Sequence, residues 1–274
     1  MPAIFAHYTF GAEALPKLTA PVRRIVSAHR TLYNLGLQGP DFYFFDQLLL
    51  LRGKCYARVG SNLHHDSCAN LLLALEGTGA RRPNSAALAY LFGLIGHFAL
   101  DSTAHPHIDT WVKELPYNHH RLETEFDRFL LERAGVEPRS FRLGDCLHAS
   151  RKDRMLVGKL YEIAGLGKAS DVAALFADFR HIKNHTTFKH NGSYQALHFL
   201  LIPFGIWRGI GGIFMGPKDT LSAVTNPQLF ALFEEAQTRY VQLADNYYRH
   251  VFEGVALDAY FQRDFETEPK EGQL

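Results

Sequence analysis

The sequence has little cysteine and no segment with the features of a targeting signal or a spanning helix. Its three cysteines form no CxxC pair, which excludes a disulfide scaffold and a cysteine-based zinc ribbon. The first residues, MPAIFAHYTFGAEALPKL, lack a basic stretch followed by an apolar one, so we expect no secretory signal and a cytoplasmic location. The longest apolar run, residues 194–216, contains an arginine, a proline and five glycines, which is a poor pattern for a spanning helix.

An excess of charge of one sign is also absent. The 274 residues include 29 Lys and Arg against 28 Asp and Glu, for a formal net charge of +1. This balance, with no basic stripe of interleaved aromatic residues, argues against nucleic acid as a partner. No Gly-x-Ser-x-Gly elbow, Walker loop or dinucleotide fingerprint occurs. The 47% hydrophobic and 21% charged residues are typical of a globular domain with a large core.

Helical periodicity dominates what is present. Apolar residues recur at steps of three and four, which predicts helices over 21–36, 86–104, 118–134, 152–166, 170–184 and 227–252. Strand-like alternation is scarce. The sequence therefore predicts one all-α domain of about eight to ten helices, spanning residues 1–264, with a disordered tail at 265–274.

Local signals suggest where several of these helices begin and end. Gly36, Pro106 and Gly135 are expected to end helices, and Asn118 and Ser170 occupy N-cap positions. Because proline disfavours the helical conformation of the preceding residue, we expect the helix that contains residue 97 to end near Ala104.

Histidine is the abundant residue, and it is unevenly placed. Of 15 histidines, seven lie between positions 64 and 120. His97 and Asp101, in GHFALDSTAHPH, share one face of an apolar helix. After that helix ends, the chain is expected to turn His105 or His107 back toward the same face. One such pair alone is more often a core histidine bonded to a helix-end aspartate.

A second polar face lies in NHHRLETEFD, where His119, Glu123 and Asp127 recur at four-residue steps. By itself this pattern is more typical of a solvated stripe. Two neighbouring helices that each offer His-x-x-x-Asp or His-x-x-x-Glu, however, match the way helical proteins supply nitrogen and oxygen ligands to zinc or iron.

Three further residues are weak signals taken singly. His64 lies in GSNLHHD, and His7 is a lone histidine in FAHYTFG. Asp41 follows a Gly-Pro turn and precedes an aromatic run, GPDFYFF. Partial desolvation there would suit a metal ligand or a proton acceptor.

The order and spacing of these pieces resemble the bacterial zinc-dependent phospholipase C family, relatives of the P1-type nucleases. The resemblance covers roughly residues 1–135 and rests on one ordered array: His7, Pro40–Asp41, His64, His97-x3-Asp101, His105-Pro106-His107 and His119-x3-Glu123. It implies an all-helical domain that holds two to three zinc ions.

The resemblance also implies which residues bind each ion. Asp41, His64, His97 and Asp101 would bind one zinc. His119 and Glu123, with either His105 or His107, would bind a second. Asp101 would bridge to a third with His7, and the Pro2 amine is an open candidate for the same ion.

Such a cluster implies a hydrolase of phosphoric esters, a phospholipase C-like phosphodiesterase acting through a metal-activated water, with Asp41 as the catalytic carboxylate beside that water. The substrate would be a phospholipid or another phosphate ester. Two alternatives stay open: a non-catalytic metal-binding helical protein, and an intracellular phosphoesterase or nuclease-like enzyme that acts on a small or nucleotide substrate.

The apolar segment 194–216 bears on the choice of substrate. Its Phe, Leu, Ile and Trp residues among glycines are typical of a segment that dips into a bilayer surface, and would allow transient membrane contact. The alternative is a buried helix followed by a packed glycine-rich loop, since apolar runs of this length usually belong to a core.

Overall fold

The computed structural model describes residues 3–46, 56–77, 84–114, 118–205, 207, 210–220 and 222–266. Within these ranges the chain forms eleven α-helices and no strand, which confirms the predicted all-α class. The helices are α1 (Ile4–Ala14), α2 (Ala20–Ala28), α3 (Arg30–Gly36), α5 (Ala57–His64), α6 (Cys68–Glu76), α7 (Ser85–Glu114), α8 (His119–Arg133), α9 (Arg151–Ile163), α10 (Ala169–Lys183), α11 (Asn191–Leu201) and α13 (Ser222–Glu253).

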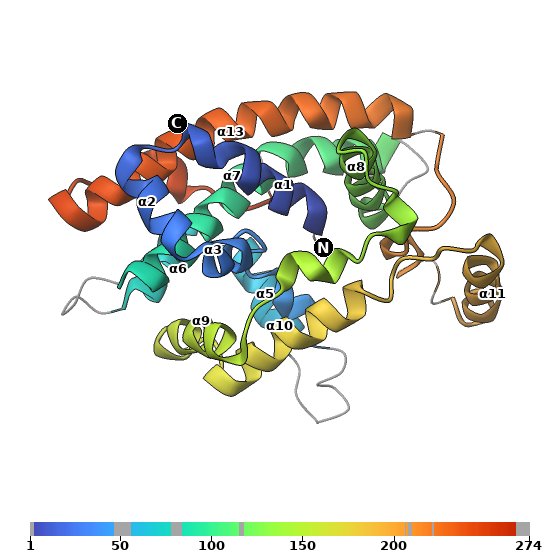
Figure 1. The fold of residues 1–274 in the computed structure, drawn as a ribbon, viewed down its shortest axis with the longest axis horizontal. Coiled ribbons are helices and arrows are strands. Elements are labelled where there is room, and N and C mark those ends of the chain that lie inside the picture. Colours follow the sequence, from blue (N-terminus) through green and yellow to red (C-terminus); the bar gives the residue numbers. More distant parts are fainter. Residues whose placement is uncertain are drawn as a thin grey trace.

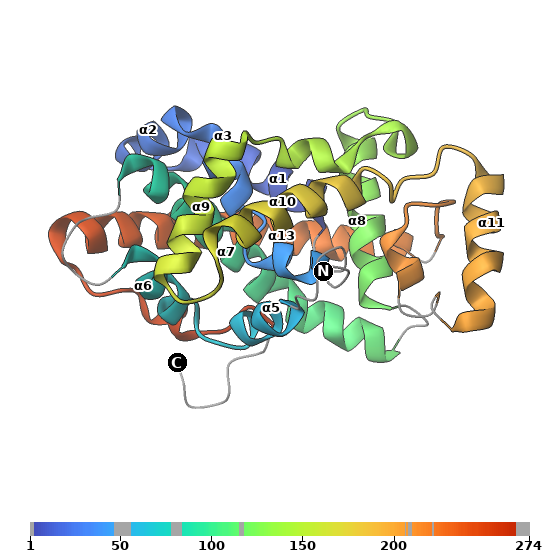
Figure 2. The same cartoon turned by 90° about the horizontal axis from the view of Figure 1, so that it is seen from below.

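Helix α7 is the central element of the fold. Every residue from Ala87 to Ser102 is buried, because α1, α2, α3, α8, α9 and α13 all pack around it. Figures 1 and 2 show α13 running along it, with the N-terminal helices on another side. A helix that is apolar on every side belongs inside a core, and the polar side chains on this one therefore have to find partners within the protein.

The same helix is long and apolar enough to cross a membrane by length and composition alone. The most apolar part of it is 89% buried within the protein, as is usual for the core helix of a globular domain. Among the described residues no other helix passes that test.

The prediction that this helix ends near Ala104 is wrong. Helix α7 continues through Pro106 to Glu114. Proline has no N–H to donate to the carbonyl four residues earlier, which is that of Ser102. Here the Arg263 guanidinium Nη2 donates to the Ser102 oxygen instead, at 3.1 Å. A donor from the distant end of the chain therefore satisfies the carbonyl that proline leaves open.

Two glycines let α3 approach α7 at backbone distance. A Cβ at Gly36 would lie 2.0 Å from the Tyr90 carbonyl oxygen, and one at Gly93 would lie 2.2 Å from the Tyr33 carbonyl oxygen. Any side chain at either position would force the helices apart. This contact sets the position of the turn that follows Gly36, which the sequence correctly marked as a helix end.

Other local predictions had mixed outcomes. Asn118 caps α8 by accepting a hydrogen bond from the Arg121 N–H, as predicted. Gly135 follows the end of α8 in a left-handed conformation. Helix α10, in contrast, begins at Ala169 with Lys168 as its N-cap, so Ser170 is not the cap.

Residues near the C-terminus pack into the core. Phe265 is fully buried, and its N–H donates to the His64 carbonyl oxygen at 3.1 Å. The packed structure thus extends beyond Asp264 into the segment expected to be a disordered tail. Residues 267–274 of that segment lie outside the described residues.

The role of Arg263 can be tested with a double-mutant cycle. Arg263→Ala should lower the free energy of unfolding by about 1–3 kcal/mol, because it leaves a buried carbonyl unsatisfied. In a Pro106→Ala background the new N–H of residue 106 can reach Ser102, so Arg263→Ala should cost much less. Urea unfolding of the four proteins measures the difference. An equal cost in both backgrounds would refute this account of the helix.

Candidate metal centre

The core of the site is a ladder of polar side chains on α7. His97, Asp101 and His105 follow at four-residue steps and therefore lie on one face. The His97 Nε2 lies 3.0 Å from Asp101 Oδ2, and the His105 Nε2 lies 3.9 Å from Asp101 Oδ1. All three side chains are buried. The Asp101 carboxylate therefore lies close to two imidazoles inside the apolar core.

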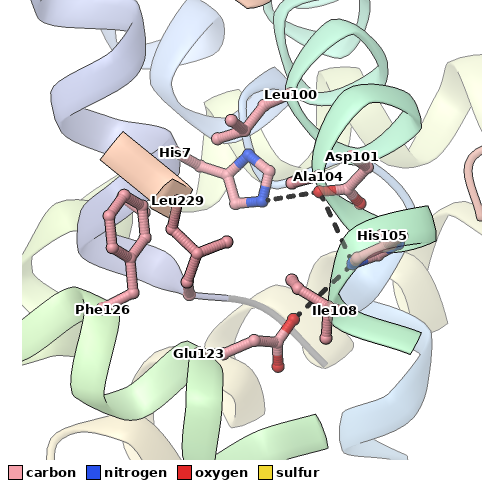
Figure 3. A pocket seen from close by; sticks show the side chains of 11 residues that line it. His7, Leu100, Asp101, Ala104, His105, Ile108, Glu123, Phe126 and Leu229 are labelled. Atoms are coloured by element: carbon pink, nitrogen blue, oxygen red, sulfur yellow. Dashed lines mark ion pairs between the residues drawn. The ribbon is translucent and has the colours of Figure 1, made fainter. Parts of the chain in front are cut away.

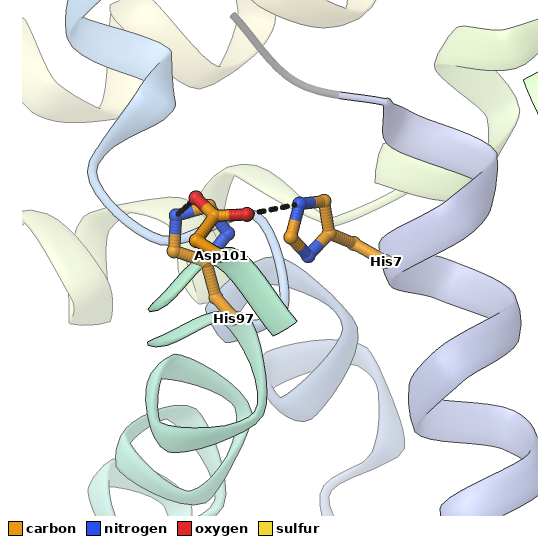
Figure 4. A group of neighbouring side chains, drawn as sticks. All are labelled: His7, His97 and Asp101. Atoms are coloured by element: carbon orange, nitrogen blue, oxygen red, sulfur yellow. Dashed lines mark ion pairs between the residues drawn. The ribbon is translucent and has the colours of Figure 1, made fainter. Parts of the chain in front are cut away.

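Helix α1 adds a third imidazole to the same carboxylate. The His7 Nε2 lies 3.1 Å from Asp101 Oδ1. Figure 4 shows the Asp101 carboxylate between the rings of His7 and His97. The lone N-terminal histidine, which carried little information in the sequence, thus belongs to the centre of the group.

Asp41 and His64 approach His97 from its other side. Asp41 begins the 3₁₀ helix η2 (Asp41–Phe45), and His64 ends α5. Asp41 Oδ1 lies 2.8 Å from His64 Nε2, and Asp41 Oδ2 lies 3.9 Å from His97 Nε2. The other nitrogen of His64, Nδ1, is 2.8 Å from the Gly60 carbonyl oxygen. That contact fixes the ring with Nε2 toward Asp41.

Gly39 makes this approach possible. Its φ of +51° is a left-handed conformation that favours glycine, and a Cβ there would lie 2.0 Å from His97 Cδ2. The turn after α3 therefore passes directly over the His97 ring before it delivers Asp41.

The first turns of α8 complete the arrangement. The Glu123 Oε1 lies 3.2 Å from His119 Nε2 and 3.7 Å from His105 Nε2. His105 thus joins the α8 pair to Asp101. A cavity of about 30 Å³, room for an ion or a water molecule, lies between Asp101 and Glu123 and is lined by His7, His105 and apolar residues. Figure 3 shows these four polar side chains pointing toward one another.

The donor atoms form three groups, each of which could hold a metal ion. Within each group the atoms lie within 4.8 Å of one another: His7, His97 and Asp101; Asp41, His64 and His97; and His105, His119 and Glu123. The first two share His97, and the contacts of His105 connect the third. The groups therefore form one continuous polar cluster.

The charges of the cluster favour cations. Burial would raise the pKa of Asp101, but the imidazoles of His97, His105 and His7 hold it well below its usual range. Positively charged groups nearby, His119 and His105 among them, hold the pKa of Glu123 well below its usual range, and His97 and His64 lower that of Asp41, each against the effect of burial. Three ionised carboxylates in one buried space need compensating positive charge.

Protons on imidazoles supply that charge in the metal-free protein. Although burial lowers it, the pKa of His7 is raised by Asp101 and that of His64 by Asp41. The pKa of His119 is raised to about 9 by Glu123 and Asp109, against the effect of burial. In His97 burial outweighs the carboxylates and lowers the pKa. Metal ions would take over the role of these protons.

A second observation, on the hydrogen bonding of the imidazoles, also indicates that these residues could bind a metal. The Nδ1 atoms of His97, His7 and His105 are buried without a hydrogen bond, and the contact of His97 Nε2 with Asp101 Oδ2, although 3.0 Å long, does not have hydrogen-bond geometry. Buried polar atoms in proteins are normally paired, and an unpaired imidazole nitrogen is a ligand for zinc. The mixed imidazole and carboxylate set suits zinc or another transition metal better than magnesium or calcium.

The structure brings all but one of the expected ligands together. His107 is exposed and lies away from the cluster, because residues two apart on an unbroken helix project about 200° apart. The sequence left open whether His105 or His107 faces the cluster. Because α7 continues through Pro106, His105 faces the cluster and His107 does not. Pro2 lies outside the described residues.

Two carboxylates support the cluster; Asp109 was missed from the sequence, and Asp127 was expected only as part of the polar face of α8. Asp109 Oδ1 lies 3.5 Å from His119 Nδ1, and it continues the four-residue spacing of His97, Asp101 and His105 along α7. That pattern is visible in the sequence once Pro106 is allowed inside the helix. Asp127, on the polar stripe of α8, accepts a hydrogen bond of 2.8 Å from the Ala6 N–H. It therefore caps the first turn of the helix that carries His7.

Phe265 was also missed. Its ring centroid lies 5.5 Å from that of His64 and 5.7 Å from that of His97. An apolar ring thus packs against two imidazoles of the cluster. Only the fold brings residue 265 to this place, and no local pattern in the sequence marks it.

A family model described as zinc-dependent phospholipase C matches residues 6–170. The chain belongs to the zinc-dependent phospholipase C family. The matched part contains every residue of the three donor groups. Searches of the curated proteins and of the solved structures found no significant match. The family is one of hydrolases, and its dependence on zinc agrees with the donor set of this member.

Gly39→Ala tests the turn over His97. The substitution should lower the free energy of unfolding by more than the roughly 1–2 kcal/mol of left-handed strain, and it should lower the zinc content, because the methyl group overlaps the His97 ring. Gly135→Ala is the matched control, since Gly135 has a φ of +71° and nothing within 4 Å of its Cβ. Thermal unfolding and metal analysis compare them. Equal effects would show that the overlap is unimportant.

The two neighbouring histidines give a second test. His105→Ala should weaken zinc binding by at least about 10–100-fold, the cost of losing even an outer-shell partner of a metal. His107→Ala should leave zinc binding unchanged. Competition with a chromogenic chelator measures both affinities. If only the His107 variant lost zinc affinity, the assignment of His105 to the site would be wrong.

Proposed function

We propose that this protein hydrolyses phosphoric esters as a phospholipase C-like phosphodiesterase with two to three zinc ions. One observation carries the proposal: three groups that could each hold a metal ion, two of which share His97, lie in one continuous and largely buried cluster within a chain of the zinc-dependent phospholipase C family. A structural zinc site is usually a closed set of four ligands. The groups connected through His97, Asp101 and His105 offer more ligands than a structural zinc site needs.

The metals would be held by the three groups named above, with Asp101 between two of them. Bound zinc supplies Lewis-acid chemistry, in that it offsets charge on phosphate oxygens and lowers the pKa of water. The chain itself provides the carboxylates that orient the reacting groups. Asp41 is our candidate for the one that accepts a hydrogen bond from the attacking water and takes its proton.

The environment of Asp41 suits that role. It is ionised, because His97 and His64 lower its pKa against the effect of burial. One of its oxygens faces His64 and the other faces His97, so the carboxylate bridges two imidazoles at the edge of the donor groups. A lowered pKa keeps Asp41 ionised, so that it can accept a hydrogen bond from water, and its proton uptake would depend on the lowered pKa of water at bound zinc.

The proposed substrate is a phospholipid, which is what membership of the family supports. The near-neutral charge of the chain supports a lipid over a nucleic acid, since nucleic-acid binding draws on many phosphate contacts from cations. The cytoplasmic location expected from the sequence stays a prediction.

An activity screen of the zinc-loaded protein tests the proposal. We expect hydrolysis of phosphatidylcholine-type lipid and of p-nitrophenyl phosphodiesters, and none of single-stranded nucleic acid. Asp41→Asn should lower the rate by about 10²–10⁴-fold, the range for losing a general base. Asp245→Asn, on α13 and outside the cluster, is the control and should leave it unchanged. A loaded protein with no activity on any ester would favour the non-catalytic alternative, and activity on nucleotides alone would favour the nuclease-like one.

A further inference from the structure

Large apolar side chains gather at the surface in one short segment. Phe199, Leu200, Ile202 and Phe204 are 70%, 63%, 46% and 72% exposed. They lie at the end of α11 and in the 3₁₀ turn η5 (Ile202–Phe204), and neither element contains a buried residue. We call these four residues the apolar tip. The expectation that this part of segment 194–216 is a buried helix is therefore wrong.

The tip stands away from the rest of the molecule. Figures 1 and 2 both place α11 at one end, separate from the helices around α7. Its inner side rests on aromatic residues: the Trp207 ring lies 5.3 Å from that of Tyr194, 4.7 Å from that of His198 and 5.8 Å from that of Phe214. The helix thus has one supported side and an apolar end that faces outward.

The stretch of sequence that carries the tip has an excess of basic residues. Residues 179–218 contain no Asp or Glu, but they contain five Lys or Arg and four His. This contrasts with the balanced charge of the whole chain. Lys183 is buried, and Arg180 and Lys218 pair with Asp145 and Glu132, whereas Lys189 is exposed. Apolar residues at a projecting end, in a segment with an excess of basic residues and with Trp and Tyr at the base, match a segment that enters the interface of an anionic bilayer.

The segment that carries the tip is fixed to the metal centre through α8. A Cβ at Gly212 would lie 2.2 Å from Asn118 Oδ1, so this backbone lies directly on the N-cap of α8. The Arg121 Nη2 donates to the Pro217 carbonyl oxygen at 3.0 Å, and the Arg128 Nη2 donates to the Gly216 carbonyl oxygen at 2.5 Å. The same helix carries His119 and Glu123.

We propose that the apolar tip inserts into the interface of an anionic phospholipid bilayer and holds the metal centre at the membrane surface. The biological role of this docking rests on the proposed function, because a lipid hydrolase has to meet its substrate at the membrane interface. The docking itself is a separate physical property, which can be measured without any hydrolysis.

Vesicle sedimentation of the full-length protein tests the docking. The vesicles contain phosphatidylcholine, with or without phosphatidylglycerol. We expect stronger binding when phosphatidylglycerol is present, and weaker binding to those vesicles as salt is raised. Phe199→Ser with Phe204→Ser should lower the partition coefficient by about tenfold or more, because two large apolar side chains are lost from the interface. Ile163→Ser is the matched control, since Ile163 is 68% exposed at the end of α9. It should bind as the unchanged protein does.

Activity separates this proposal from the proposed function. The double variant should keep its rate on a water-soluble phosphodiester and lose rate on vesicle lipid. Binding to vesicles without hydrolysis of any ester would contradict the proposed function and leave the docking standing. Equal vesicle binding by the variant and the control would overturn the docking. So would sedimentation velocity showing that the tip joins two copies of the chain, with no binding to vesicles.

Discussion

The structure depends on one buried carboxylate. Asp101 projects from the middle of the central helix and lies within 4 Å of three imidazoles, those of His97, His7 and His105. These imidazoles come from two helices, and through them the carboxylate connects to Asp41, His64 and Glu123. A lone ionised carboxylate would be very costly inside an apolar core. The fold stabilises this one by surrounding it with groups that carry positive charge or bind a cation.

The packing around α7 follows from that requirement. Gly36 and Gly93 bring α3 into backbone contact with α7, and Gly39 then turns Asp41 over the His97 ring. Asp127 caps α1 and so holds His7 against Asp101. Burial raises the pKa of Asp127 to about 7, although the nearby Lys183 lowers it. Each of these contacts positions a backbone segment rather than a ligand atom. Together they bring η2 and α1 to α7, two of the five elements (α1, η2, α5, α7 and α8) that converge on one small volume.

Much of this could be predicted from the sequence. The periodicity gave the main helices, and the four-residue spacing of His97 with Asp101 and of His119 with Glu123 placed each pair on one helical face. The error at Pro106 shows the limit of local reasoning, because the partner that keeps the helix intact is Arg263, 157 residues further along the chain. The supporting roles of Phe265 and Asp127 are also long-range. The exposure of the apolar tip could not be foreseen either, since an apolar run has the same pattern whether it is buried or not.

The most direct test of the central claim is the zinc content of the full-length protein and of its Asp101→Asn variant, after loading and dialysis, by inductively coupled plasma mass spectrometry. Asparagine keeps the shape of the side chain but removes the charge that the imidazoles and metal ions share. The account predicts about two to three zinc ions per chain in the unchanged protein, as in clustered metal hydrolases, and a loss of more than one ion in the variant. Less than one ion per chain in the unchanged protein, or the same content in both, would contradict it.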